Sequence, residues 1–223
     1  AGSAVCAPSR CILLTGKHGG HAYIRGNHEW GERGPVWDMA KAADDPNLEG
    51  QYPMDPEEVT IAEYLQEAGY NTAFIGKWHM GWNWDMDSLD VIDLSKRITH
   101  SPNDVGFDYS IGHAATLDIA PYVYVENGMP TAIPTDSTAS EDKYGWWRKG
   151  LTAPDFIHED VTPNLFRRSI KFIQERSKEK EPFFLYLALP SPHTPILPTE
   201  AWQGKSGLNP YGDFVMMVDD YMG

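Results

Sequence analysis

Twice along this chain, a helical pattern is followed by a short apolar strand and then by a turn that carries a histidine. The first predicted strand, 71–75, leads into Lys77 and His79, and the second, 183–189, leads into His193. Helix and strand patterns that alternate in this way predict an α/β fold with a mostly parallel sheet. Since ligands of open α/β sheets bind beyond the carboxyl ends of the strands, these three side chains are predicted to share one pocket.

Capping residues mark the helices that precede these strands. Thr60 and Glu63 form the capping box of a helix over 60–68. Thr162 is predicted to cap the second helix, with Pro163 at its first position. The residues predicted to face inward are Ile61, Tyr64, Leu65 and Ala68 in the first helix and Leu165, Phe166, Ile170 and Ile173 in the second.

The N-terminal segment reads CAPSRCILLTG from Cys6 to Gly16. Pro8 and Gly16 predict a short helix over 8–15 that begins beside Cys6, so that this side chain lies at a helix N-terminus, where anions are favoured. The chain has only two cysteines, and Cys11 falls within the same predicted helix. That spacing gives poor geometry for a disulfide, and two cysteines without a second pair do not make a zinc site.

Composition narrows the kinds of partner. With 223 residues, the chain is long enough for one sizeable α/β domain. The 32 acidic residues outnumber the 18 basic ones, and the resulting net charge of −14 argues against a nucleic-acid binder. No apolar run is long enough to span a bilayer. Because the overall charge repels anions, any anion-binding site must be a local cluster of lysine, arginine and histidine.

Three motifs, in this order, resemble landmarks of the type I sulfatases, a family within the alkaline phosphatase superfamily. The stretch Cys6–Arg10 with the following Leu-Thr-Gly resembles the first signature, 69–79 resembles the second, and Pro-His-Thr-Pro at His193 resembles a shorter third. The resemblance reaches most of the chain, although 29–55 and 132–158 match it only loosely. It also covers the predicted helix at 60–68, Gly106-Phe107-Asp108 and 211–223.

This resemblance implies an alkaline-phosphatase-like fold, in which a mixed, mostly parallel sheet is sandwiched between helices and is incomplete at both ends. It implies that residues 1–223 form a partial sulfatase catalytic domain that lacks the first strand and the C-terminal part. The parent would be a sulfuric ester hydrolase, periplasmic or secreted, that acts on a sulfated carbohydrate. The 223-residue stretch by itself would be inactive.

The resemblance also implies a role for each motif residue. A formylglycine-generating maturation enzyme oxidises the thiol of Cys6, and the hydrated aldehyde attacks the sulfur of a sulfate monoester. Arg10 orients this diol, and Lys77 contacts both the diol and the sulfate. His79 is the base for sulfate release, and His193 contacts the sulfate or the leaving oxygen as the acid; the two histidine roles can be exchanged.

Further candidates each have a structural alternative. Thr116 falls where related enzymes place a hydroxyl near the sulfate, and an ordinary loop threonine is the alternative. The Trp146-Trp147-Arg148 stretch could stack on a sugar ring, and burial in the core is the alternative. Lys17 is either a source of positive potential or a solvated loop lysine. The residues proposed to line the pocket mouth are His18, His21 and Arg25.

A divalent cation, usually calcium, is implied beside the diol. The family binds it through an Asp pair on the first strand and an Asp–Asn pair further along, and neither pair is present here. Asp44-Asp45 follows Cys6 instead of preceding it, and Asp219-Asp220 lies on a predicted helix, so both are interpreted as non-ligands. Residue 6, as formylglycine, is the one candidate metal ligand in this sequence.

Two other functions remain open at this stage. A phosphonate monoester or phosphodiester hydrolase of the same superfamily can also use formylglycine and nearly the same motif. A non-catalytic, truncated binding chain is the other alternative. The intact set of Cys6, Arg10, Lys77, His79 and His193 argues against that last interpretation for the parent protein.

Overall fold

The computed structural model describes residues 2–27, 53–55, 57–85 and 92–223, and its centre is a five-stranded sheet in the order β4-β3-β2-β1-β7. The middle strand β1 pairs in parallel with β2 and β7, while β3 and β4 continue the sheet as an antiparallel hairpin. The bounds are Asn71–Lys77 for β1, Tyr109–His113 for β2, Val125–Glu126 for β3, Met129–Pro130 for β4 and Phe183–Ala188 for β7.

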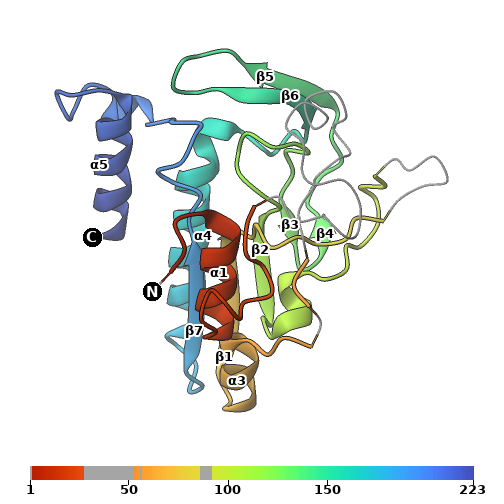
Figure 1. Cartoon of the computed structure of the whole chain (residues 1–223). Coiled ribbons are helices and arrows are strands. Elements are labelled where there is room, and N and C mark those ends of the chain that lie inside the picture. Colours follow the sequence, from red (N-terminus) through yellow and green to blue (C-terminus); the bar gives the residue numbers. More distant parts are fainter. Residues whose placement is uncertain (1, 28–52, 56, 86–91) are drawn as a thin grey trace.

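Helices cover both faces of this sheet (Figure 1). On one face lie α1 (Cys6–Thr15) and α3 (Ile61–Glu67). On the other face α4 (Val161–Arg176) packs on β1 and β7, and its Phe172 ring stacks on Tyr109 of β2. The predicted α/β sandwich with a mixed, mostly parallel sheet is therefore confirmed.

The remaining elements surround this core. The strands β5 (Asp136–Ser140) and β6 (Trp147–Thr152) form a separate antiparallel hairpin, and α5 (Pro210–Met222) packs on a short 3-10 helix, η3 (Glu200–Trp202). Figure 1 shows the hairpin above the carboxyl ends of the strands and α5 to one side of the sheet. Two further 3-10 helices are η1 (Pro102–Val105) and η2 (His158–Asp160).

The first helix begins earlier than its proline predicts. It starts at Cys6, with Val5 at the N-cap, so Pro8 occupies the third helical position and not the first. The main-chain N–H of Ala7 is satisfied from a distance, because it donates to the Asn27 side chain over 2.9 Å. Gly16 ends the helix at φ +66, as predicted.

The inward face predicted for α3 is wrong. Its capping box of Thr60 and Glu63 is present, but Ala62 is its buried residue, while Ile61 and Tyr64 are exposed. The helix approaches its neighbours through its first turn, where a Cβ on Gly106 would lie only 2.4 Å from the nitrogen of Glu63. With this contact, the face of α3 that was predicted to point inward is turned away from the core.

The inward face predicted for α4 is correct only in part. The helix begins at Val161 with Asp160 at the N-cap, so Thr162 lies inside it. Leu165 and Phe166 are buried as predicted, but Ile170 and Ile173 are exposed. Ser169 and Phe172 are buried on the side of α4 that faces the sheet instead. The Ser169 hydroxyl donates to the Leu165 oxygen, and the Phe172 ring stacks on Tyr109.

Two strand predictions need adjustment. The strand β1 extends to Lys77, so this lysine is the last strand residue and not the first residue after the strand. The strand β7 is half-buried over 183–187, since it lies at the edge of the described sheet and not under cover on both sides. The turn between β3 and β4 contains Asn127 and Gly128, at φ +48 and +81.

Asp44-Asp45 lies outside the described residues. The described pieces, 17–27 and 53–55, contain no helix or strand. No helix in the described part of the chain is long and apolar enough to cross a membrane.

Candidate active site

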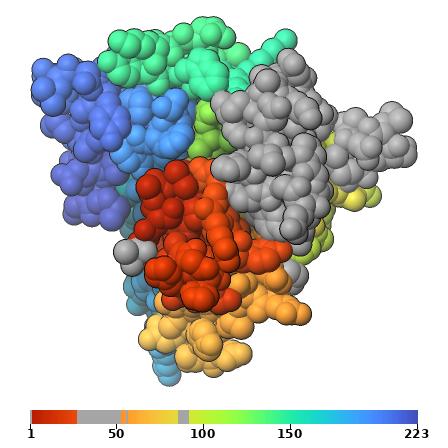
Figure 2. All heavy atoms as spheres, viewed as in Figure 1, coloured from red at the N-terminus to blue at the C-terminus, as the bar shows by residue number. Residues whose placement is uncertain are grey.

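Arg10 joins the first helix to the carboxyl ends of two strands. Its Nη1 donates to the main-chain oxygen of Lys77 over 2.5 Å, and its Nη2 donates to that of Leu189 over 3.1 Å. These two carbonyls belong to the last residue of β1 and the first residue after β7. The N-terminus of α1, with Cys6, is thereby held above the strand ends. In Figure 2 the N-terminal segment, in red, lies at the surface on the side of the sheet that α1 covers.

Lys77 places a buried cation beside Cys6. Lys77 is only 2% exposed. Burial lowers the pKa of the Lys77 ammonium to about 8, and the neighbouring Cys6 opposes this shift while Arg10 adds to it. A desolvated ammonium in this position can stabilise negative charge that develops on a group attached at residue 6.

His79 lies two residues beyond β1 and is buried. Its backbone adopts φ +56, and its main-chain N–H donates to the Ala114 oxygen over 2.7 Å. Burial, then the charges of Lys77 and Arg10, lower the pKa of His79 well below its ordinary value. The imidazole is therefore neutral near neutral pH, which is the form that can accept a proton.

His193 approaches the same place from the segment after β7. Its Nδ1 lies 2.7 Å from the Thr194 oxygen, and since a carbonyl only accepts, this nitrogen carries the proton in the neutral ring. Its Nε2 is then the acceptor. His193 is exposed, and it is one of the groups that lower the pKa of His79.

The segment that carries Thr116 lies at the edge of this cluster. Thr116 is buried and begins a turn that closes with a hydrogen bond from the Ile119 N–H to its oxygen. Asp118 in this turn forms a buried ion pair with Arg148 of β6, with Oδ2 and Nη2 3.3 Å apart. The Asp118 carboxylate partly offsets the lowering of the Lys77 pKa, so the turn interacts electrostatically with the site.

Sequence reasoning missed His113. It is the last residue of β2, it is the register partner of Lys77, and it is buried. Burial and the charge of Lys77 lower the pKa of His113 to about 3, so its ring is neutral. A signal was present, since Gly106-Phe107-Asp108 opens a strand that ends at this histidine, but no motif of the resemblance includes it.

Several candidates have structural roles instead. Lys17 forms an ion pair with the buried carboxylate of Glu58 at 2.6 Å. Trp147 stacks on His158 with ring centroids 4.0 Å apart, so the core alternative holds for this tryptophan. The predicted pocket-mouth residues His18 and His21 pack edge to face on each other. Arg25 donates to the Ala22 oxygen. These contacts lie within the segment 18–25 and not with the cluster at the strand ends.

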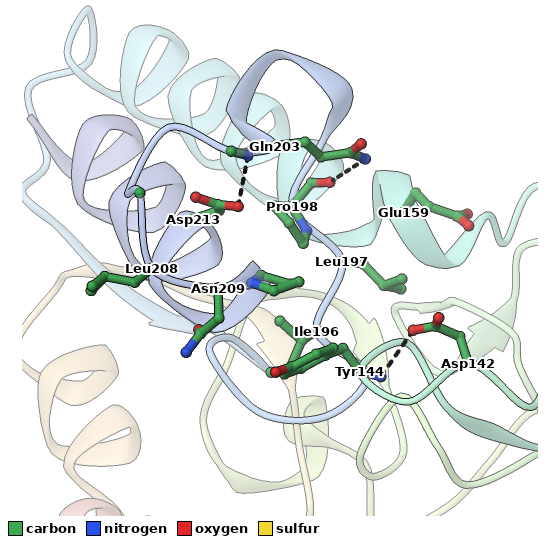
Figure 3. Close-up of a pocket in the computed structure, with 13 residues that line it drawn as sticks. Asp142, Tyr144, Glu159, Ile196, Leu197, Pro198, Gln203, Leu208, Asn209 and Asp213 are labelled. Carbon is green, nitrogen blue, oxygen red and sulfur yellow. Dashed lines mark hydrogen bonds between the residues drawn. The ribbon is translucent and has the colours of Figure 1, made fainter.

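A cavity of about 540 Å³ lies away from the cluster (Figure 3). Its walls come from the turn between β5 and β6, from 196–198 and from the start of α5, and they include Tyr144, Ile196 and Asp213. None of the predicted site residues lines it. A smaller hollow of about 350 Å³ is lined by Cys6, Arg10 and Tyr186, which places it at the candidate site.

The charges around Cys6 do not fit a calcium ion by themselves. The Lys77 ammonium acts on Cys6 and Arg10 lines the same hollow, whereas calcium prefers a set of carboxylate and carbonyl oxygens. Among the described residues there is no group of three or more histidine, cysteine, aspartate or glutamate side chains that could hold a metal ion. Asp219 and Asp220 lie on α5, at one side of the sheet and apart from α1 in Figure 1.

A parallel α/β sheet with a cationic, histidine-bearing cluster at its strand ends defines a candidate site for an anionic ester. The chain matches the Sulfatase family model over residues 1–223, and it belongs to the sulfatase family. It is 31% identical over 195 residues to an N-acetylgalactosamine-6-O-sulfatase from Bacteroides thetaiotaomicron, with 72% of this chain covered. It is 27% identical to an arylsulfatase from Hemicentrotus pulcherrimus, with 98% of this chain covered.

A solved structure described under the metabolism of multiple glycosaminoglycans by Bacteroides thetaiotaomicron has the same fold. It aligns with all of this chain at a TM-score of 0.72 and 27% identity, and the alignment covers 48% of that structure. This chain spans 37% of the length of the Bacteroides relative and 34% of the length of the arylsulfatase.

Proposed function

We propose that the protein to which this chain belongs hydrolyses a sulfate monoester. The observation that carries the proposal is the buried ammonium of Lys77 beside Cys6, at the N-terminus of α1. A sulfate monoester repels nucleophiles because its oxygens are negatively charged. Attack on its sulfur therefore needs fixed cations and a strong nucleophile in one place.

In this proposal Cys6 is the precursor of formylglycine, produced by a separate maturation enzyme. The hydrated side chain of residue 6 supplies the attacking oxygen, Arg10 orients this diol, and Lys77 contacts the diol and stabilises negative charge on the sulfate. His79 accepts the proton of the second hydroxyl so that sulfate can leave, and His193 donates to the leaving oxygen from Nε2 in its doubly protonated form, while Nδ1–H stays bonded to the Thr194 oxygen. Thr116 lies at the edge of the site as a hydroxyl for the sulfate.

The substrate class follows from the relatives. One of them is named for N-acetylgalactosamine 6-O-sulfate and another for aryl sulfates. We propose a sulfated carbohydrate as the natural substrate, in the periplasm or outside the cell. Calcium stays part of the proposal, with residue 6 as its only ligand among the described residues and residues 1–223 as part of a larger catalytic domain.

The test is an assay of the full-length protein, produced together with a formylglycine-generating enzyme. Turnover of an aryl sulfate and of a sulfated amino sugar, with mass spectrometry showing sulfur replaced by oxygen at residue 6, is the expected result. Faster turnover of an aryl phosphodiester or phosphonate would favour the other hydrolase class. A protein that carries formylglycine and hydrolyses none of these esters would refute the proposal.

A further inference from the structure

Two neighbouring histidines at the strand ends each have a ring nitrogen without a partner. The Nδ1 of His79 and the Nε2 of His113 are both buried, and neither makes a hydrogen bond with any of the described residues. The main-chain N–H of His79 donates to the oxygen of Ala114, which keeps the two residues side by side. Buried polar atoms are nearly always paired in native proteins, so these two nitrogens call for a physical explanation.

The backbone bonds between the two strands continue past the end of β1. Lys77 and His113 are register partners on parallel strands, so their side chains share a face. The Trp78 N–H donates to the His113 oxygen over 3.0 Å, and the His79 N–H donates to the Ala114 oxygen over 2.7 Å. His79 therefore lies beside the residue that follows His113, and His113 is one of the groups that lower the His79 pKa.

The hydrogen bond of His113 fixes which of its nitrogens carries the proton. Its Nδ1 lies 2.8 Å from the Ala115 oxygen, and a carbonyl oxygen only accepts. In the neutral ring Nδ1 is therefore protonated, and Nε2 has a free lone pair. Burial and the charges of Lys77 and Arg10 keep the pKa of His113 near 3, so this form persists at neutral pH. Its lone pair repels a sulfate oxygen and needs a donor.

We propose that His113 is a positioning residue for His79. Its Nε2 accepts a hydrogen bond from a bridging water, which in turn accepts one from the Nδ1–H of His79, so that His79 presents an unprotonated Nε2 to the reacting group. The Ala115 oxygen, His113 and His79 then form one chain of hydrogen bonds. The inference rests on the proposed function, in which His79 is the base. A third group that orients a catalytic base is a recurring device in hydrolases.

Two substitutions separate this role from a structural one. The amide of asparagine overlaps Nδ1 of histidine, and the amide of glutamine overlaps Nε2. His113→Asn therefore keeps a donor for the Ala115 oxygen and removes the acceptor for His79, whereas His113→Gln does the opposite. In the full-length, formylglycine-bearing enzyme, His113→Asn is expected to lower kcat on an aryl sulfate about 10- to 100-fold. His113→Gln is expected to retain most of the activity, and the reverse order would overturn the proposal.

The tautomer of His79 is a second readout, which does not require activity or a stable variant. Nitrogen NMR of the histidine-labelled full-length protein is expected to find the His79 proton on Nδ1 in the unmutated protein and on Nε2 in His113→Asn. A proton on Nε2 of His79 in the unmutated protein would overturn the positioning role. If the His79 proton lies on Nδ1 in the unmutated protein but this protein hydrolyses no sulfate ester, the proposed function fails and the hydrogen-bond chain stands.

Discussion

The guanidinium of Arg10 donates a hydrogen bond to the main-chain oxygen of Lys77 over 2.5 Å, which ties the first helix to the central strand. A second bond, to the Leu189 oxygen, reaches the end of β7. The segment that carries His193 follows Leu189 directly in the chain. One side chain thus fixes three parts of the candidate site relative to one another, and it does so through backbone atoms that any sequence at those positions would offer.

Replacing Arg10 is expected to cost stability as well as activity. Arg10→Ala leaves two strand-end carbonyls without their charged donor, and hydrogen bonds to charged groups contribute about 1.5–3 kcal/mol each. We expect the free energy of unfolding in urea to fall by at least about 1.5 kcal/mol. Arg25→Ala is the control, because the exposed Arg25 donates only to the nearby Ala22 oxygen. Equal losses in the two variants would contradict the tethering role.

Lys77→Met should separate activity from stability. Methionine fills a similar volume, and it removes a charge whose burial lowers the lysine pKa to about 8. Replacing a buried charge with an apolar side chain is often neutral or stabilising, so we expect no loss of unfolding free energy. In the full-length enzyme, kcat on an aryl sulfate is expected to fall about 10²- to 10³-fold. Lys17→Met, at the Glu58 ion pair, is the control and should leave kcat unchanged.

The close approach of β1 and β7 at Gly76 predicts a severe effect of a single methyl group. A Cβ at Gly76 would lie 2.2 Å from the Ala188 oxygen, and the residue has φ +135. Backbone strain and overpacking together are expected to cost about 2–5 kcal/mol in Gly76→Ala. Gly16→Ala is the matched control, since Gly16 also has positive φ but no atom within 4 Å of the added Cβ. Denaturant unfolding of both variants measures the difference, and equal losses would reject the packing argument.

The chain of residues 1–223 by itself is predicted to lack sulfatase activity. The described residues around Cys6 supply cations and no cluster of carboxylates, so calcium has too few oxygen ligands there to compete with water. Calorimetric titration of the purified chain is expected to show no tight calcium site, and an aryl sulfate assay no turnover. Calcium-dependent turnover would mean that Asp44, Asp45, Asp219 or Asp220 acts as a ligand.

The sequence predicted those parts of the fold that local chemistry determines. Thr60 and Glu63 predict their helix because a capping box is satisfied within four residues, and Gly16 predicts the end of α1 because glycine accepts positive φ. The position of Lys77 and His79 at the carboxyl end of β1 was also predictable, because it depends only on where the strand ends in the sequence.

Features that depend on the partner surface were not predictable in this way. Ile170 and Ile173 fit the helical period as well as Phe172 does, and only the position of Tyr109 decides which of them packs. His113 becomes a site residue because β2 pairs with β1 in a register that places it opposite Lys77. The sequence of either strand contains no information on that register, and the same holds for the pairing of Asp118 with Arg148.

His158 should make the protein less stable in mild acid. Its ring stacks on Trp147, and one ring nitrogen lies 3.1 Å from the Leu117 oxygen. Burial lowers the pKa of His158 to about 4, while an unfolded histidine titrates near 6.5. Between these two values the unfolded chain binds a proton that the folded chain excludes, so the free energy of unfolding decreases as the pH falls through this window.

The size of this effect follows from the linkage relation. One proton of difference changes the free energy of unfolding by about 1.4 kcal/mol per pH unit, which is about 3 kcal/mol in total between pH 6.5 and 4. His158→Phe keeps an aromatic ring on Trp147 and removes the titration, so its stability should fall less steeply over that range. Urea unfolding followed by tryptophan fluorescence at several pH values measures the slope. His21→Phe, at an exposed histidine, should leave the slope as it is, and an unchanged slope in His158→Phe would show that the buried imidazole is not the source.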